Sequence, residues 1–338
     1  MKVAVFSAHT YDRLVLDEAR HRLAACAAID FVYHTESLTR ESVALAQECG
    51  AICVFVNDVL DAPVLTALAS AGVGAILLRC AGFNNLDVAS AMGLGLFVAR
   101  VPAYSPEAIA EHTLALILTL NRHTHRAYAR VREGNFSLDG LMGSTLHGKT
   151  VGLVGLGRIG LAVARIFHGF GCCVLGYDPV EPVAFAQLGA TSTLPQLLEE
   201  ADIVSLHCPL FASTYHLIDR AALARMRPDA MLVNTSRGAV IDTGAVIDAL
   251  KSGHLGALAI DVYEQESELF FSDHSSEIIA DDLFERLMTF PNVLVTGHQG
   301  FFTREAMREI AETTIHNLLS FQTGSPCAHR VPGTFKPE

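Results

Sequence analysis

The sequence has no low-complexity tract, no CxxC pair and no apolar run long enough to cross a membrane. Basic residues are also scarce: 24 Lys and Arg stand against 36 Asp and Glu, and the formal net charge of −12 argues against binding to phosphate backbones. The 338 residues are 51% hydrophobic and only 18% charged, which is typical of a folded chain. We therefore expect a globular protein, large enough for two domains, with no nucleic-acid partner.

The most apolar segment, residues 62–78, carries no charge, but Pro63 and glycines interrupt it and Arg79 follows it. This pattern predicts a helix, a turn and a buried strand rather than a membrane-spanning helix. The apolar run near the N-terminus is too short for a signal peptide. Eight cysteines are scattered along the sequence, which predicts reduced thiols rather than a disulfide or zinc framework. We expect a cytoplasmic protein that binds no metal and no membrane.

Apolar runs of strand length alternate with helix-length segments along most of the sequence. The runs of the first hundred residues are KVAVFS, FVYHT, AICVFV and AILLR. A second series begins at Thr150 with TVGLVG and continues as CVLGYD, DIVSLHC, AMLVNTS, GALAIDVY and NVLVTG. The runs are continuous rather than alternating, which indicates strands buried on both faces of parallel sheets. The pattern predicts an α/β protein with two doubly wound parallel-sheet domains.

The domain boundary is expected near VPAYSPEAIAEH, where Ser105 and Pro106 are typical of a helix start. One long helix, AIAEHTLALILTLNRHTHRAYARV, should follow, and its apolar first half favours burial between domains or between subunits. Only one helix, residues 303–320, follows the second series, and it should pack back on the first domain. We predict a discontinuous domain of residues 1–101 and 299–338, an inserted domain of residues 102–298, an interdomain cleft, and a homodimer or higher homo-oligomer.

A glycine motif, GLGRIG, lies between an apolar strand and a helical pattern. Its glycines at 155, 157 and 160 permit a tight turn, a close approach to a pyrophosphate and tight helix–strand packing. Asp178 ends the next strand, where its carboxylate can accept hydrogen bonds from ribose hydroxyls and would repel a 2′-phosphate. This context predicts NAD as the cofactor. The residues expected to hold it here are Gly155, Gly157, Arg158, Ile159, Gly160 and Asp178.

Three polar residues follow strands of the second series, at the edge where parallel sheets bind ligands: Arg237, Glu266 and His298. Hydride transfer to a 2-keto acid needs such a set, since Arg can hold a carboxylate, His can donate a proton and an acid can favour the charged imidazole. His207 also follows a strand, and position alone does not rank it below His298. The histidines of the long helix, which are expected to face solvent or a subunit partner, are His112, His123 and His125.

Seven motifs occur along nearly the whole sequence: LRCAGFNNLD, VPAYSPEAIAEH, LHGKTVGLVGLGRIG, SLHCPL, LVNTSRGAVID, AIDVYEQE and VTGHQGFFT. In this order they resemble the D-isomer-specific 2-hydroxyacid dehydrogenase family, and ELFFSDHSS with HQGFFT is similar to its fermentative D-lactate branch. The resemblance implies a Rossmann-type NAD-binding domain inserted in a flavodoxin-like catalytic domain. It also implies that Arg237 binds the substrate carboxylate, that His298 is the proton donor and that Glu266, rather than Glu264 or Glu268, is its partner.

The resemblance implies further site residues. Those expected to contact the substrate are Cys80, Ala81, Gly82, Tyr104, Arg237 and Phe301. Those expected to contact the cofactor beyond the glycine motif are His207, Cys208, Pro209, Thr235 and Asp261. The expected reaction is the reduction of pyruvate to D-lactate by NADH. Two alternatives stay open: another D-2-hydroxyacid dehydrogenase that acts on short keto acids, such as a hydroxypyruvate or glyoxylate reductase, and an NAD(H)-sensing, corepressor-like binding protein.

Overall fold

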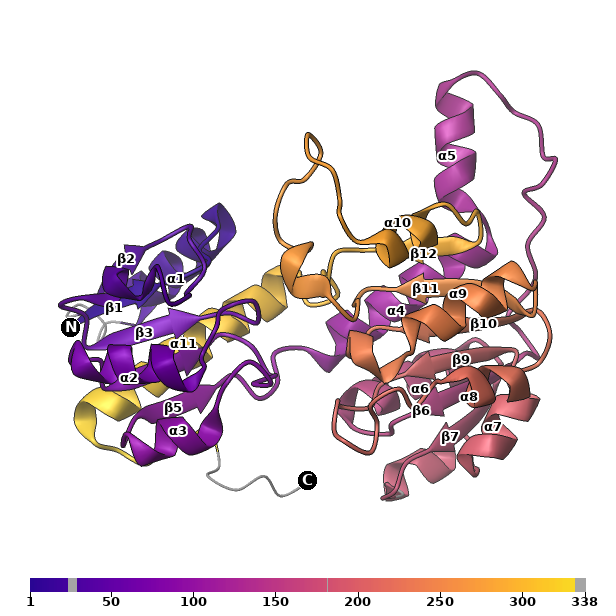
Figure 1. Ribbon diagram of the computed structural model, residues 1–338. Coiled ribbons are helices and arrows are strands. Elements are labelled where there is room, and N and C mark those ends of the chain that lie inside the picture. The colour runs from indigo at the N-terminus through magenta and orange to yellow at the C-terminus, as the bar shows by residue number, and fades with distance from the viewer. Residues whose placement is uncertain (24–28, 181, 332–338) are drawn as a thin grey trace. The chain divides into compact units, whose positions relative to one another are not determined.

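The computed structural model describes residues 1–23, 29–180 and 182–331 (Figure 1). The protein consists of two compact units. The first comprises Met1–Ser105 together with the described residues 302–331, and the second comprises Pro106–Phe301. Each unit is built on one parallel sheet, which confirms the predicted fold class.

The first unit has a five-stranded sheet of order β2-β1-β3-β4-β5, in which every pair is parallel. This is the flavodoxin-like order. Its strands are β1 (Lys2–Val5), β2 (Asp30–Tyr33), β3 (Ala51–Val54), β4 (Ala75–Leu78) and β5 (Phe97–Arg100). Its helices are α1 (Thr10–Arg22), η2 (Val43–Ala46), α2 (Ala62–Ser70), α3 (Val88–Gly93) and α11 (Arg304–Thr323). Helix α11 packs against α1, β4 and β5, so the last helix of the sequence completes the core of this unit.

The second unit has a seven-stranded parallel sheet of order β12-β11-β10-β9-β6-β7-β8. Its strands are β6 (Thr150–Val154), β7 (Cys173–Tyr177), β8 (Ala190–Thr191), β9 (Ile203–Leu206), β10 (Ala230–Asn234), β11 (Leu255–Ile260) and β12 (Val293–Val295). Its α-helices are α4 (Pro106–Asn121), α5 (Thr124–Arg132), α6 (Arg158–Gly169), α7 (Leu194–Glu200), α8 (Arg220–Arg225), α9 (Thr243–Lys251) and α10 (Asp282–Met288). Short 3-10 turns are η3 (Val183–Gln187), η4 (Gly238–Val240) and η5 (Glu266–Glu268). The order reverses between β6 and β9, as in a Rossmann-type sheet.

The prediction of one long helix after Pro106 is wrong, because this segment forms two helices. Helix α4 ends at Asn121, and α5 begins after His123, whose φ of 51° is left-handed and cannot continue a helix. The apolar face of α4, including Leu116 and Ile117, is buried in the core of its own unit beside α6. Burial of α4 therefore needs neither a second domain nor a second subunit.

The register of the sheet places three strand ends side by side in the second unit. Asn234 at the end of β10 pairs with Ile260 at the end of β11, and Ile260 pairs with Val295 at the end of β12. The loops that follow these strands therefore begin at one edge of the sheet, where open α/β folds bind ligands.

None of the described helices is long and apolar enough to span a bilayer. The seven cysteines within the described residues form no disulfide with one another.

Candidate active site

The glycine motif forms the turn between β6 and α6. Gly155 has φ of 98°, and a Cβ there would lie 2.7 Å from the backbone of His207 and Cys208. A Cβ on Gly160 would lie 2.0 Å from the carbonyl oxygen of Gly155. In contrast, a Cβ on Gly157 would meet no atom of the described residues within 4 Å, and this residue is the N-cap of α6, with no side chain to cap the helix. Gly155 and Gly160 are thus needed for packing, whereas Gly157 leaves open space before the positive end of the helix.

Asp178 follows β7 beside this turn. Its Oδ2 accepts a hydrogen bond from the Leu156 amide at 2.7 Å, and its Oδ1 accepts one from the Val180 amide at 2.9 Å. The backbone therefore orients both carboxylate oxygens and leaves further acceptor positions on each.

His298 and Glu266 meet at the end of the sheet. The Nδ1 of His298 lies 2.8 Å from Oε1 of Glu266, and the two side chains are 15% and 20% exposed. The other carboxylate oxygen accepts a hydrogen bond from the Tyr263 amide at 2.9 Å, which fixes the carboxylate. Because a carboxylate accepts the Nδ1 proton, Nε2 is the nitrogen left for external chemistry, and none of the described residues bonds to it.

Aromatic rings flank the imidazole of His298. The Phe271 ring centroid lies 5.8 Å away, and that of Phe301, an 8% exposed residue, lies 6.5 Å away in an edge arrangement. Two apolar rings limit the access of water to the imidazole and strengthen its interaction with Glu266.

Arg237 lies in the loop after β10, at the same sheet edge. The Asn234 side chain shapes this loop: its amide donates to the Arg237 carbonyl at 2.8 Å, and its oxygen accepts from the Ser236 amide at 3.0 Å. The Arg237 guanidinium donates to the Ser236 carbonyl at 2.6 Å and pairs with no carboxylate in the described part of the protein. Most of its donors thus remain for an anion.

The loops after β10 and β11 are in direct contact. A Cβ on Gly238 would lie 2.0 Å from the carbonyl carbon of Tyr263 and 2.3 Å from the Glu264 amide nitrogen. Arg237 precedes this glycine, and Glu266 follows the same stretch of the second loop. The sequence pattern that makes the contact possible is therefore the RG pair after β10.

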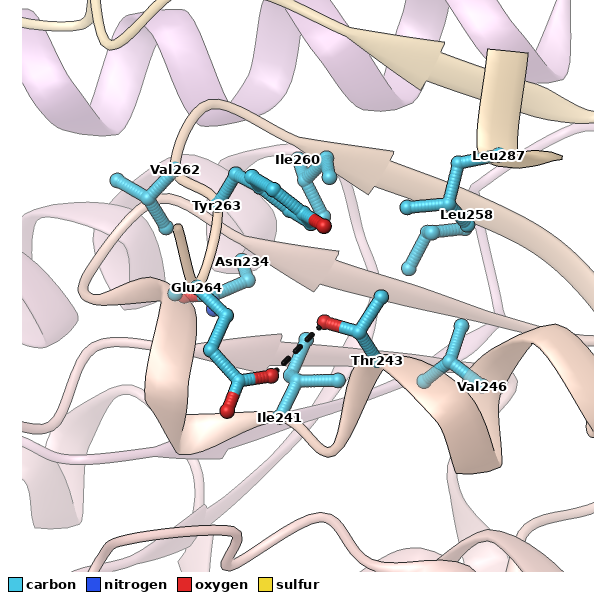
Figure 2. A pocket seen from close by; sticks show the side chains of 11 residues that line it. Asn234, Ile241, Thr243, Val246, Leu258, Ile260, Val262, Tyr263, Glu264 and Leu287 are labelled. Atoms are coloured by element: carbon cyan, nitrogen blue, oxygen red, sulfur yellow. Dashed lines mark hydrogen bonds between the residues drawn. The ribbon is translucent and has the colours of Figure 1, made fainter. Parts of the chain in front are cut away.

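A second histidine–carboxylate pair involves Glu264, two residues before Glu266. His216 Nε2 is 2.7 Å from Oε1 of Glu264, and Oε2 of Glu264 accepts a hydrogen bond from Thr243 at 3.1 Å. Figure 2 shows Glu264 and Thr243 at the edge of a small cavity whose other walls, including Ile260 and Leu287, are largely apolar. Glu264 is thus engaged away from His298, whereas Glu266 contacts it.

His207, the alternative proton donor, lies behind the glycine turn. Its Nε2 is 2.9 Å from the Ser205 hydroxyl, and its Nδ1 is buried with no partner among the described residues. Burial lowers the pKa of His207 to about 3, so the imidazole is neutral near pH 7. A neutral imidazole has no proton to spare for a substrate, which disfavours His207 as the acid. Next to it, burial raises the pKa of the Cys208 thiol to about 11.

The expected substrate residues of the first unit follow β4 and β5. The Cys80 thiol, which is buried, contacts the Gly82 carbonyl at 3.2 Å, and the Ala81 carbonyl accepts a hydrogen bond from Arg100 at 2.8 Å. Tyr104 lies just before the end of this part of the unit and is partly exposed. These contacts hold the 80–82 loop at the carboxyl end of β4.

Comparison with known proteins assigns the protein to a family. Residues 114–300 match the family model described as D-isomer specific 2-hydroxyacid dehydrogenase, NAD binding domain. The chain is 57% identical to 2-hydroxyacid dehydrogenase A of Aspergillus oryzae over 329 residues, which are 97% of this chain and 94% of that protein. The chain belongs to the D-isomer specific 2-hydroxyacid dehydrogenase family. It is also 47% identical to the D-lactate dehydrogenase of Escherichia coli over 332 residues, covering 98% of this chain and 100% of that one.

A solved structure extends this similarity to three dimensions. The apo-structure of D-lactate dehydrogenase from Escherichia coli matches with a TM-score of 0.89 and 45% sequence identity, covering 98% of this chain and 100% of that chain. As a member of this dehydrogenase family, the protein is an oxidoreductase whose cofactor is NAD. The observed turn fits that group, because Gly157 leaves room before an uncapped helix end and Asp178 presents oriented oxygens to a ribose.

The structure places His112 differently from the expectation. The sequence analysis expected this histidine to face solvent or a subunit partner. Its side chain is instead only 16% exposed, and its Nε2 lies 3.2 Å from Oδ1 of Asp261. No local sequence signal points to this contact, because it joins α4 to the loop after β11.

Proposed function

We propose that this dehydrogenase reduces pyruvate to D-lactate with NADH and catalyses the reverse reaction with NAD. The observation that supports this proposal best is the pair formed by His298 and Glu266, 2.8 Å apart, at the strand edge that also carries Arg237. NADH, when bound, supplies the hydride. The protein must bind the keto acid, orient it and provide one proton.

Arg237 is assigned to the substrate carboxylate. A planar guanidinium donates two parallel hydrogen bonds to a carboxylate, which fixes both the position and the orientation of a short keto acid. The rigid turn formed by Asn234 and Ser236 holds the Arg237 backbone, and no carboxylate of the described residues competes for the side chain. Arg237 thus provides charge for binding and polarises the adjacent carbonyl.

His298 is assigned as general acid for reduction and general base for oxidation. Its Nδ1 proton is held by Glu266, so that Nε2 carries the proton that goes to the carbonyl oxygen as the alkoxide develops. The carboxylate offsets the charge of the imidazolium before transfer. In the oxidation of D-lactate, the neutral Nε2 takes the hydroxyl proton back.

The remaining assignments follow the family pattern. Cys80, Ala81 and Gly82 are assigned to the substrate carboxylate, and Tyr104 and Phe301 to its methyl end. The residues assigned to NAD are Gly155, Gly157, Arg158, Ile159, Gly160, Asp178, His207, Cys208, Pro209, Thr235 and Asp261. For Asp261, one oxygen, Oδ2, has a single donor among the described residues, the Gly300 amide at 2.8 Å, so it retains an acceptor position for an amide donor.

The decisive experiment measures NADH consumption by the purified protein with pyruvate, hydroxypyruvate, glyoxylate and phenylpyruvate. We expect the highest kcat/KM with pyruvate, and an enantiospecific assay should identify the product as D-lactate. A preference for hydroxypyruvate or glyoxylate would show that pyruvate is not the main substrate, but the protein would still be a D-2-hydroxyacid dehydrogenase. NADH binding without turnover of any of the four keto acids would favour a corepressor-like binding protein.

We also propose that the protein forms a homodimer through α5 and the segment after it, residues 124–143. Figure 1 shows α5 projecting from the sheet of its unit, and five large apolar side chains of this segment are exposed. They are Tyr128 (66%), Val131 (50%), Phe136 (74%), Leu138 (82%) and Met142 (91%). Several exposed apolar side chains within one short segment favour a protein interface there. Light scattering of the wild type and of L138D should show a dimer that weakens in the variant.

We propose a cytoplasmic location, because free thiols such as the buried Cys53 and Cys208 are typical of a reducing compartment. Cell fractionation in the source organism tests this location.

A further inference from the structure

A row of three polar residues lies directly beneath the loops of the candidate active site. Thr235, Asp261 and Thr296 are each the first residue after β10, β11 and β12. Two consecutive residues of α4 contact this row. His112 reaches Asp261 and Thr296, and the Thr113 hydroxyl lies 2.9 Å from that of Thr235. Helix α4 is thus joined by polar contacts to three strand ends at once.

Asp261 is the centre of the row and is only 2% exposed. Its Oδ1 accepts hydrogen bonds from the Thr296 hydroxyl at 2.5 Å, from the Gln299 amide at 2.9 Å and from His112 Nε2 at 3.2 Å. Its Oδ2 accepts one from the Gly300 amide at 2.8 Å. Burial opposes ionisation, but the hydrogen bonds from His112 and Thr296 outweigh it and lower the pKa of Asp261.

The amides that Asp261 binds belong to the two residues after His298. His298 has φ of 52°, a left-handed conformation that is costly for a residue with a side chain and persists only where neighbouring contacts impose it. On the C-terminal side of His298, the Gln299 and Gly300 amides donate hydrogen bonds to the Asp261 carboxylate. On its N-terminal side, the His298 amide donates a hydrogen bond to the Thr296 carbonyl at 3.1 Å. Together these bonds hold the left-handed backbone of His298. The direction of the catalytic imidazole therefore depends on where Asp261 is held.

His112 fixes that carboxylate from a separate element. The Thr296 hydroxyl proton points to Asp261, so Nε2 of His112 must carry the proton that is shared between the Thr296 oxygen and the carboxylate. The approach is close enough that a Cβ on residue 300 would lie 3.1 Å from Oδ2 of Asp261 and 3.3 Å from Cδ2 of His112. Gly300 thus allows the carboxylate, the imidazole and the loop to pack together.

We propose that His112 is a positioning residue of the reaction, which acts through Asp261 to hold His298 in the conformation needed for proton transfer. The proposal rests on the function proposed above for His298. It assigns to α4 a part in catalysis, although no residue of α4 is placed against the substrate.

The test compares H112L with H112Q. Leu has similar bulk and no donor, whereas the amide of Gln can place an N–H near the position of Nε2. We expect H112L to lower kcat for pyruvate reduction roughly tenfold, because a small misplacement of a catalytic group is costly, with KM for pyruvate changed much less. H112Q should recover most of the lost kcat.

Two further measurements separate positioning from a general structural role. In a D261N background, H112L should lower kcat by less than about threefold, because residues that act in series are not additive. Amide hydrogen exchange of the 296–301 loop, which needs no turnover, should be faster in H112L than in the wild type and near wild type in H112Q. If H112L does not fold, H112N replaces it, since its shorter amide keeps a polar group but does not reach Asp261.

The outcomes distinguish this proposal from that for the function. A wild-type protein that turns over no keto acid would sink the proposed function, while loop exchange would still test His112. An active wild type with H112L within about twofold in kcat and unchanged loop exchange would overturn the positioning role. Equal losses in H112L and H112Q would also overturn it, because they would show that the ring shape matters and the donated hydrogen bond does not.

Discussion

Replacing Glu266 by Gln removes a negative charge beside His298 and keeps an oxygen that can accept the Nδ1 proton. The contact is 2.8 Å long, and both side chains are mostly buried, so solvent screens the charge only in part. A hydrogen bond to a charged group contributes roughly 1.5–3 kcal/mol and a neutral one roughly 0.5–1.5 kcal/mol. The corresponding limits differ by about 1–1.5 kcal/mol, which predicts a roughly five- to thirteenfold fall in kcat, since 1.36 kcal/mol is a factor of ten in rate.

The protein offers a matched control in E264Q. Glu264 also pairs with a histidine, His216, at 2.7 Å, and that pair is 27% and 22% exposed, so the chemical change and its surroundings are nearly the same. We expect E264Q to keep kcat within about twofold of the wild type, because Glu264 contacts His216 and not His298.

The assay is steady-state NADH oxidation with pyruvate at saturating cofactor, with the thermal midpoint of each variant as a check on folding. E266Q should lower kcat and leave KM for pyruvate nearly unchanged, because Glu266 acts on the imidazole rather than on the substrate. The reasoning would be refuted if E266Q kept wild-type kcat, or if E264Q lost as much activity as E266Q.

Three further outcomes are expected. R237K should raise KM for pyruvate about tenfold or more in the same assay, because a lysine cannot form the two parallel bonds of a guanidinium; an unchanged KM would remove Arg237 from the substrate site. G157A should keep the wild-type thermal midpoint and weaken NADH binding about tenfold in a fluorescence titration. G155A should fail to fold, because Gly155 has a positive φ and a Cβ at this position would collide with the backbone. His207 has a folded-state pKa lowered to about 3 by burial, so its contribution to stability is complete above the unfolded value of about 6.5 and is lost as pH falls toward 3. Urea unfolding measures this as the fall in the free energy of unfolding between pH 7.5 and pH 5. That fall should be about 2 kcal/mol smaller in H207Q than in the wild type, and an equal fall in both proteins would contradict burial of a neutral imidazole.

Local patterns in the sequence were enough to predict most strands of both sheets. Runs such as those of β3 and β4 are apolar at every position, and every residue of these strands is buried, as parallel sheets require. The two-residue strand β8 was missed because it is exposed and has no apolar run. The break between α4 and α5 was missed because it depends on one left-handed residue, His123, in a segment that otherwise has a helical pattern.

By itself, the sequence determined the glycine turn, the acid after β7 and the set of polar residues at strand ends, because each of these depends on neighbours within one strand–loop–helix unit. Tertiary structure decided which carboxylate meets which histidine: Glu266 pairs with His298, Glu264 pairs with His216, and His112 reaches Asp261. The physical reason is that such pairs join loops from different strands, so they depend on sheet register, on the left-handed backbone at His298 and on the packing of α4, none of which leaves a local pattern in the sequence.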